Sequence, residues 1–366
     1  MKTTDNLFIS LVPDFKEGVG HILPYHLMIR EILDKTKYNH YVLYYDKKTY
    51  KYKNWKNVLK MGRLNAYSNK FYFLLIFDFF LFTSSIFKSL KSLDSSKNKV
   101  FFIESFGIIE ICAFLLSIFF IKNSKIIIFF RSYPYGLKKY IYKILFILIK
   151  IFTSNSLYLC SDSESLSNAL KIYFKLKIVT FPVPIKYNFS NSNLKSEPKK
   201  LIWWPGPYRE EKGAATIRKI ASELFLYPKF TLCVTEDFKG IKYNKNIIYT
   251  KKNLSSKEYK NMFLRSEVIL LPYDKLRYQF STSNIFIESI IASKFTFVTK
   301  DTWMADELIR YGLEDFVLEI NNFSLEGIIK IINNKILIKK LNKMSLLYKN
   351  KHSLNNFKLQ LLGYIK

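Results

Sequence analysis

Strand-like and helix-like segments alternate along residues 255–318, and this alternation constrains the fold more than any other feature of the chain. In order, the segments are a helix pattern at 255–267, the apolar run VILLPY, a helix pattern at 281–293, the apolar run FTFVT and a helix pattern at 303–312. Such alternation predicts a parallel sheet with helices on its faces. Ligands of these sheets bind beyond the carboxyl ends of the strands, which places residues 272–284 and 300–303 around one crevice.

The first half of the chain alternates in the same way. Its expected strands are LFISLV, HYVLYY, VFFIES, KIIIFF and LYLCS. Residues 186–199 break the periodicity and are rich in Asn, Ser and Lys, as exposed linkers are. We therefore expect an α/β chain with two similar, doubly wound parallel-sheet domains at 1–185 and 200–335, joined by this linker and followed by a helical segment at 336–366.

The chain is strongly basic, with 58 Lys and Arg against 29 Asp and Glu. Two interpretations stay open: a bias toward Lys, Ile and Asn in the whole composition, or a basic surface for an anionic partner. Aromatic residues make up 17% of the chain, but they lie mainly in apolar runs and not between exposed basic residues. A nucleic-acid interface is therefore not expected.

The cysteines and the first residues favour a cytoplasmic protein. Cys112, Cys160 and Cys233 are isolated in apolar sequence, with no CxxC pair and no histidine cluster, which suits a reducing compartment. The first apolar run is short and is interrupted by Pro13 and Asp14, so we expect a strand there and not a signal peptide.

Two long apolar runs begin at Phe71 and Phe106. Each contains an acidic residue, Asp78 or Glu110, and the second run ends at Lys122. That length is below the roughly 20 residues that a membrane span requires. We expect both runs to form buried helices.

The segment WWPGPYREEKG, residues 203–213, combines the end of a strand, a tight turn and the start of a helix. Such a turn exposes backbone N–H groups, and Arg209 and Lys212 add positive charge, so a phosphate group would suit it. The other interpretation is a solvated turn that contains Glu210 and Glu211 beside the two cations.

A second phosphate-binding element is expected at STSNIFIESI. Ser283 and the residues before it are typical helix N-caps, so the free N–H groups and the positive end of the helix dipole point to the same edge of the sheet. Glu288 follows on an apolar helix face, where a carboxylate is costly without a partner. That partner is either the ribose of a nucleotide or a Lys or Arg in a structural ion pair.

These segments resemble the donor-binding domain of GT-B glycosyltransferases, in particular the large retaining group called family 4. The similarity rests on SKEYKNMFLRSEVILLPY, STSNIFIESIIAS and DTWMADELIRYG, and on PGPYREEKG, which resembles the family's Gly-Arg and Lys-Gly element. It implies two Rossmann-like domains that face a cleft. It also implies transfer of a hexose-type sugar from a nucleoside diphosphate sugar, which serves as a co-substrate with no further cofactor.

The resemblance also assigns roles. Arg209 and Lys212 would bind the diphosphate and Glu288 the ribose, and these are the expected catalytic residues. Other donor-binding residues are expected at Gly206, Tyr208, Tyr273, Ser283, Asn284, Thr302 and Trp303. On the acceptor side, the GVGH turn with Gly20 and His21 resembles the family's first glycine loop, and Arg131 stands where many members place a histidine.

The chain departs from the family at Phe280, where a second glutamate is common. No metal site is expected, because the acidic runs at 161–165 and 300–303 lack the Asp-x-Asp pair that would hold a divalent ion on the diphosphate. Fixed cations and helix N-termini would stabilise the leaving diphosphate instead.

A basic helix is expected at about 137–152. The interval between Glu110 and Asp162 has no acidic residue but contains Lys122, Lys125, Arg131, Lys138, Lys139, Lys143 and Lys150. The spacing of Lys139, Lys143 and Lys150 puts them on one helix face. Such a helix either lies on anionic lipid or packs on its domain with an ordinary solvated lysine stripe.

We therefore expect a cytoplasmic glycosyltransferase, peripheral at the inner face of the cell membrane. Its partners would be the nucleotide-sugar donor, a lipid-linked or cell-surface glycan acceptor (an O-antigen, capsule or lipo-oligosaccharide precursor) and the anionic membrane surface. The alternative is a non-catalytic, membrane-associated polysaccharide-assembly protein on a GT-B scaffold, which the missing carboxylate at position 280 leaves open.

Overall fold

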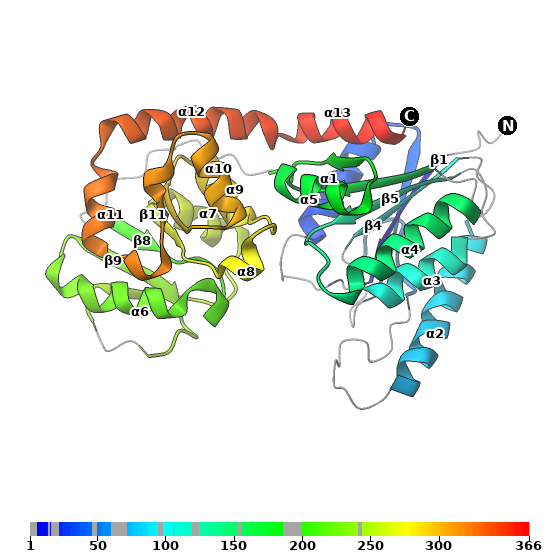
Figure 1. Cartoon of the computed structure of the whole chain (residues 1–366), viewed down its shortest axis with the longest axis horizontal. Coiled ribbons are helices and arrows are strands. Elements are labelled where there is room, and N and C mark those ends of the chain that lie inside the picture. The colour runs from blue at the N-terminus through cyan, green and yellow to red at the C-terminus, as the bar shows by residue number, and fades with distance from the viewer. Residues whose placement is uncertain are drawn as a thin grey trace. The chain divides into compact units, whose positions relative to one another are not determined.

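The computed structural model divides the chain into two compact units, Met1–Phe181 with Lys358–Lys366, and Pro182–Phe357. Each unit contains its own parallel sheet (Figure 1). The structure describes residues 6–13, 15, 22–45, 50–59, 72–93, 98–104, 106–118, 124–152, 156–185, 200–240 and 244–365. The expected linker at 186–199 lies outside these residues.

The first unit is built on a seven-stranded sheet of order β3-β2-β1-β4-β5-β6-β7. The strands are β1 Asn6–Val12, β2 Tyr38–Tyr44, β3 Trp55–Asn57, β4 Lys99–Glu104, β5 Ser124–Phe130, β6 Ser156–Ser161 and β7 Ile178–Thr180. The central strands β1, β4 and β5 are buried along nearly their whole length. Continuous burial is what a parallel sheet covered on both faces requires, so the apolar runs of the sequence become strands.

The helices of the first unit are α1 Ile22–Leu33, α2 Tyr72–Lys91, α3 Ile108–Ile118, α4 Leu137–Phe152, α5 Glu164–Phe174 and the end of α13 Leu354–Ile365. Helix α2 packs on α3, and α3 packs on α4. The last turns of α13 are tied to this unit, because the Tyr38 hydroxyl donates a hydrogen bond to the Ile365 carbonyl at 2.5 Å. The chain thus returns to its first unit at the end.

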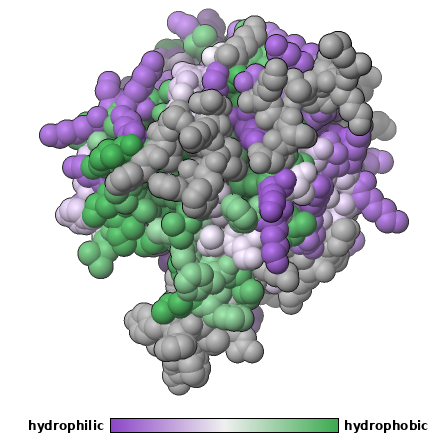
Figure 2. Space-filling model, turned by 90° about the vertical axis from the view of Figure 1, so that its right-hand side faces the viewer, coloured by the Kyte–Doolittle hydropathy of each residue, from purple (hydrophilic) through white to green (hydrophobic). Residues whose placement is uncertain are grey.

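The two long apolar runs form helices α2 and α3. None of the helices in the described residues is long and apolar enough to cross a membrane. The expectation that both are buried is wrong for α2, because Ile76, Phe77 and Phe80 are each more than half exposed. Figure 2 shows hydrophobic surface on this side of the unit.

The second unit is built on a six-stranded sheet of order β10-β9-β8-β11-β12-β13. The strands are β8 Lys200–Trp203, β9 Phe230–Thr235, β10 Ile247–Thr250, β11 Ser266–Leu271, β12 Phe295–Thr299 and β13 Val317–Leu318. The helices are α6 Ala214–Glu223, α7 Ser256–Arg265, α8 Lys275–Tyr278, α9 Asn284–Ile291, α10 Trp303–Arg310, α11 Leu325–Ile332 and α12 Lys335–Lys351. The strand order changes direction between β8 and β11, and such a switch point leaves a crevice at the carboxyl ends.

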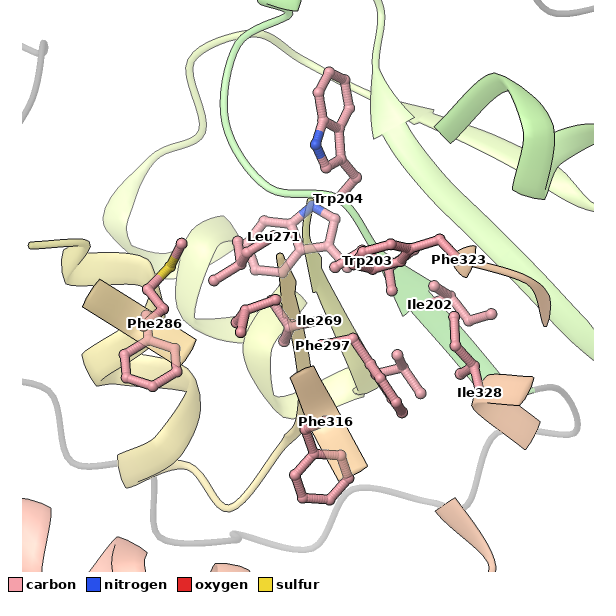
Figure 3. Close-up of a cluster of buried hydrophobic side chains, with 14 of the residues drawn as sticks. Ile202, Trp203, Trp204, Ile269, Leu271, Phe286, Phe297, Phe316, Phe323 and Ile328 are labelled. Atoms are coloured by element: carbon pink, nitrogen blue, oxygen red, sulfur yellow. The ribbon is translucent and has the colours of Figure 1, made fainter. Parts of the chain in front are cut away.

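Aromatic side chains anchor both faces of β8. Trp203 packs edge-on against Phe263 of α7, at a ring separation of 5.1 Å, and the next residue, Trp204, packs edge-on against Phe238, also at 5.1 Å. Figure 3 shows other members of this core, among them Phe286 of α9. Because successive residues of an extended chain point to opposite faces, this pair anchors the end of β8 on both sides. The loop that follows β8 therefore starts from a rigid base.

Candidate functional site

The turn after β8 holds Lys212 against its own backbone. Gly206 has φ of +90°, and a Cβ at this position would lie 2.8 Å from Lys212 Nζ. Only glycine combines that backbone angle with so close an approach. Residues 210–212 form a short 3₁₀ helix, whose Lys212 carbonyl accepts a hydrogen bond from Trp204 Nε1 at 3.1 Å. The lysine side chain is consequently buried beneath the turn.

A second glycine joins this turn to the loop after β11. Gly213 has φ of +84°, and a Cβ there would lie 2.0 Å from the Pro272 carbonyl oxygen. The Asp274 N–H donates to the Glu211 carbonyl at 2.8 Å. The two loops on either side of the switch point are therefore fixed to each other. Lys212 Nζ comes to lie 5.5 Å from the centre of the Tyr273 ring.

The two glutamates of the turn are occupied by other arginines. Glu210 pairs with Arg218 at 2.9 Å and Glu211 with Arg277 at 3.3 Å. Among the residues that the structure describes, no carboxylate forms an ion pair with Arg209 or Lys212. The turn thus carries positive charge that its own acids do not neutralise.

Lys212 shows the electrostatic effect of this arrangement. Burial, and then the charge of Arg209, lower the pKa of its ammonium to about 8, although Glu211 opposes the shift. An anion placed beside Lys212 and Arg209 would raise that pKa again, because an opposite charge favours the protonated form. The site therefore favours an anionic ligand.

Tyr273 and the start of α9 complete one side of this site. Tyr273 is buried, and burial raises the pKa of its phenol, while Arg209 and a hydrogen bond with Ser283 oppose the shift. Ser283 caps α9, because its Oγ accepts a hydrogen bond from the Phe286 N–H at 3.3 Å. A Cβ on Gly206 would lie 3.9 Å from Ile285 Cδ1, so the first turn of α9 lies beside the turn that carries Lys212.

Glu288 is buried one turn further along α9. Its Oε2 accepts a hydrogen bond from the Tyr259 hydroxyl of α7 at 2.5 Å. In the described part of the chain, no cation pairs with it, so the structural ion pair allowed by the sequence is not found. Burial raises the pKa of Glu288 to about 7, against the effect of the Tyr259 hydrogen bond.

Three other expected donor-binding residues contact other residues of the second unit. The Tyr208 hydroxyl donates a hydrogen bond to Glu210 and accepts one from Arg218. Thr302 caps α10 and donates to the Thr299 carbonyl at 2.7 Å. The Trp303 ring packs edge-on against Phe286 at 5.4 Å. The residues that the structure brings together are Gly206, Arg209, Lys212, Tyr273, Ser283 and the first turn of α9.

In the first unit, Arg131 belongs to a closed network of charges. It follows β5 and donates to Glu104 Oε2, at the end of β4, at 2.8 Å, and its other terminal nitrogen lies 3.5 Å from Asp162. His26 Nε2 lies 2.7 Å from Glu104 Oε1. Although burial raises the pKa of Glu104, Arg131 and His26 outweigh it and lower that pKa to about 2. Gly20 and His21, the other acceptor-side expectations, lie outside the described residues.

Sequence reasoning missed His26, Glu104 and Tyr259. Glu104 carried a usable signal, because it ends a buried strand at the carboxyl edge, where polar residues of such sheets gather. Within the described ranges, no three His, Cys, Asp or Glu side chains are grouped as a metal site would require.

No protein-family model matches the sequence, and no curated protein matches it. Solved structures do match over the whole chain. A glycosyltransferase from Rickettsia africae ESF-5 is 13% identical, with 100% of this chain and 98% of that chain covered and a TM-score of 0.67. A UDP-forming α,α-trehalose-phosphate synthase from Burkholderia xenovorans is 11% identical, with 99% and 98% covered and a TM-score of 0.65.

The fold is that of GT-B glycosyltransferases. The two parallel-sheet domains that the sequence predicted are present, and their sheets have seven and six strands. The N-terminal domain of trehalose-6-phosphate phosphatase from Candida albicans is also similar, at 11% identity, with 100% and 97% covered and a TM-score of 0.68. A fold of this kind does not by itself determine an activity, so function has to be argued from the site.

Proposed function

We propose that the protein is a glycosyltransferase that uses a nucleoside diphosphate sugar and binds its diphosphate at Arg209 and Lys212. One observation carries this proposal. The acids of the same turn pair with Arg218 and Arg277, and in the described residues both cations lack a counter-ion at the switch point of the sheet. Lys212 is buried whereas Arg209 is exposed to solvent, and for Lys212 a buried charge without a partner is costly. A bound diphosphate would supply that partner.

The proposed reaction breaks the bond between the anomeric carbon of the sugar and the diphosphate, and the bonding electrons leave with the diphosphate. The hydroxyl oxygen of the acceptor forms the new bond to that carbon and releases its proton. Negative charge therefore develops on the diphosphate, where fixed positive groups stabilise the transition state. Arg209, Lys212 and the free N–H groups at Ser283 and Asn284 are such groups, and no metal ion is needed.

Glu288 binds the ribose hydroxyls in this proposal. Tyr259 already donates to Oε2, whereas Oε1 has no hydrogen-bond partner among the described residues. Hydroxyl donors stabilise the ionised carboxyl group, so donor binding lowers the pKa of Glu288 from about 7. The buried acid then gains the partners that it lacks in the unliganded protein.

The finer assignments follow the resemblance of the sequence to family 4. The sugar is of hexose type, its anomeric configuration is retained, and the acceptor is a lipid-linked or cell-surface glycan at the inner face of the membrane. Further contacts are assigned to Gly206, Tyr208, Tyr273, Thr302 and Trp303 for the donor, and to Gly20, His21 and Arg131 for the acceptor. The similar trehalose-phosphate synthase is UDP-forming, so uridine nucleotides are the first donors to test.

A panel of nucleotide sugars tests the proposal by thermal stabilisation, because a ligand of the folded state raises the melting temperature according to its affinity. At least one donor should stabilise the wild type, and Lys212→Ala should lose that stabilisation. Lys257→Ala, at an exposed position on α7, is the matched control and should retain it. If no nucleotide stabilises the wild type, or if Lys212→Ala responds fully, the proposed site is wrong.

The second candidate is a non-catalytic, membrane-associated assembly protein on the same scaffold. Phe280 favours it, because the family commonly has a second glutamate at that position. Single-turnover hydrolysis of the donor separates the two candidates. A catalyst should hydrolyse the bound donor slowly even without an acceptor, whereas an assembly protein should bind it and leave it intact.

A further inference from the structure

Helix α4 exposes a continuous apolar stripe. The most exposed members are Leu137 at 78%, Ile151 at 67%, Ile144 at 59% and Tyr140 at 54%. Together with Ile147 they follow a spacing of three and four residues, which places them on one side of the helix. Tyr142, Phe146 and Ile149 face the opposite way and are buried. The helix is therefore apolar on its inner and its outer side.

Helix α2 carries a second exposed apolar stripe on the same unit. Phe80 is 63% exposed, Phe77 61% and Ile76 56%, and Phe87 lies further along the helix. Helix α3 packs against both α2 and α4, and its Leu116 is exposed. Figure 2 shows the resulting hydrophobic surface at the left and toward the lower end of this side. We call the outer surface of α2, α3 and α4 the apolar face.

The second unit has no comparable surface on its described helices. Its exposed large apolar residues are spread over several elements, at Phe225, Leu226, Tyr249, Leu276, Ile309, Ile336, Ile338, Leu346 and Leu347. Scattered apolar side chains are ordinary, but a large contiguous patch on a protein surface marks an interaction site. The apolar face therefore requires a partner.

Lysines identify the kind of partner. Lys138 and Lys150 are exposed on α4, and Lys88 and Lys91 are exposed at the end of α2. The sequence between Glu110 and Asp162 contains no acidic residue. An anionic bilayer satisfies both features, since its interior accepts apolar side chains to a depth of about 5–10 Å and its headgroups attract lysines. Two copies of this face would instead place lysine against lysine, which is unfavourable.

We propose that the apolar face docks the first unit on an anionic lipid bilayer by inserting the outer side chains of α2 and α4. This surface stands on its own geometry, and it rests on the proposed function only in placing a lipid-linked acceptor beside it. The lysine stripe expected from the sequence, Lys139, Lys143 and Lys150, lies beside the exposed apolar stripe of α4 and is not the outermost part of the helix. Lys139 and Lys143 are only partly exposed, and their ammonium groups lie over the Tyr173 ring at 5.1 and 5.6 Å. Apolar insertion thus contributes most of the affinity and the lysines add a preference for anionic lipid.

Flotation of the full-length protein with vesicles tests this proposal. The vesicles are phosphatidylcholine alone, or with about one third phosphatidylglycerol. The wild type should float with the anionic vesicles. The variant Phe77→Ser, Phe80→Ser, Ile144→Ser should bind them at least tenfold more weakly. Lys138→Gln with Lys150→Gln should lose only the preference for anionic lipid, about threefold to tenfold.

The matched control is Phe225→Ser with Leu226→Ser, at exposed positions of the second unit, and it should float as the wild type does. Sedimentation velocity on the same variants tests self-association. Flotation of the serine variant like the wild type, no flotation of the wild type, or a wild-type dimer that the serine variant dissociates would each overturn the proposal. Thermal stabilisation by nucleotide sugars, measured on all of these variants, keeps the two proposals separate. Membrane docking can fail while the donor still binds, and donor binding can fail while the protein still docks.

Discussion

Both sheets place charged residues at the carboxyl ends of their strands. The residues of the first unit are paired with one another, whereas, within the described part of the chain, two cations of the second unit are not. In the first unit, Arg131 pairs with both Glu104 and Asp162, and His26 lies against the same glutamate. In the second unit, Arg209 and Lys212 have no counter-ion in the described residues. A network that is already paired holds its own fold together. Cations that the fold leaves unpaired are where an anionic ligand can be bound.

The pKa values follow the same division. Glu104 is fully buried, yet its partners lower its pKa to about 2 and it stays ionised. Burial dominates at the other site, where it lowers the pKa of Lys212 to about 8 and raises that of Glu288 to about 7. Groups shifted toward neutrality by burial are typical of functional sites. Among these three groups, the direction of the shift therefore separates the paired Glu104 from Lys212 and Glu288 of the proposed binding site.

The strongest way to break this comparison is Glu104→Ala. Removing one member of a buried charge network leaves its partners uncompensated, and the expected loss is about 3–5 kcal/mol in the free energy of unfolding. Chemical denaturation of the full-length protein, followed by tryptophan fluorescence or circular dichroism, measures it. A variant as stable as the wild type would show that the network does not stabilise the fold.

Lys212→Ala should have the opposite profile. Loss of one fixed positive group from the departing diphosphate should lower kcat by about 10²–10³-fold. Stability should be unchanged or slightly higher, because an unpaired buried ammonium is removed. Steady-state kinetics with the best donor and a thermal melt check the two parts. A variant with near wild-type turnover, or one that melts far below the wild type, would contradict the division between the two clusters.

The sequence predicted the parts of this molecule that depend on local pattern. The parallel sheets are confirmed, and the turn at Gly206 and the cap at Ser283 lie where their residue types predicted. Their roles in binding stay predictions. Pairing across the fold could not be derived, because it depends on how distant loops meet. Glu211 reaches Arg277 across 66 positions of sequence, and the partner of Glu288 is Tyr259, 29 positions away.

The outer surface of α2 and α4 shows a similar limit. The sequence predicted that both segments are helical, α2 from its apolar run and α4 from the spacing of its lysines, and that the α2 segment is interior. An apolar residue on a helix has the same identity whether its side faces a sheet or solvent, so composition alone could not separate Phe82, which is buried, from Phe80, which is exposed. Only the packing of α2 on α3 decides between the two sides.

Gly213→Ala tests whether the close approach of two backbone segments holds the proposed binding site together. The φ of +84° at Gly213 and the 2.0 Å approach to Pro272 leave no space for a Cβ. We expect a loss of about 1–3 kcal/mol in stability together with weaker donor binding, because the loops after β8 and β11 must separate. Gly363→Ala is the matched control. A Cβ at Gly363 would meet no heavy atom within 4 Å, and alanine should stabilise this helix by about 0.5–1 kcal/mol. Equal melting temperatures for the two variants would contradict the close approach.

The pH dependence of donor binding gives the smallest and most specific effect. The ionised Glu288 accepts hydrogen bonds from the ribose hydroxyls. Donor affinity should therefore fall as the pH drops below about 7, where Glu288 becomes protonated in the free protein. The protonated Lys212 binds the diphosphate, so affinity should also fall as pH rises above about 8. Each limb should approach a tenfold change per pH unit, because one proton is linked to binding on each side.

Calorimetry with an intact nucleotide sugar measures both limbs, since its diphosphate diester does not titrate in this range. Glu288→Gln should remove the acid limb and retain the basic one, because an amide keeps a hydrogen-bond acceptor but does not ionise. Arg131→Lys in the first unit should leave both limbs unchanged, because the paired network takes no part in binding the donor. If Glu288→Gln leaves the acid limb in place, the proton belongs to another group, and Glu288 is a buried structural acid like Glu104.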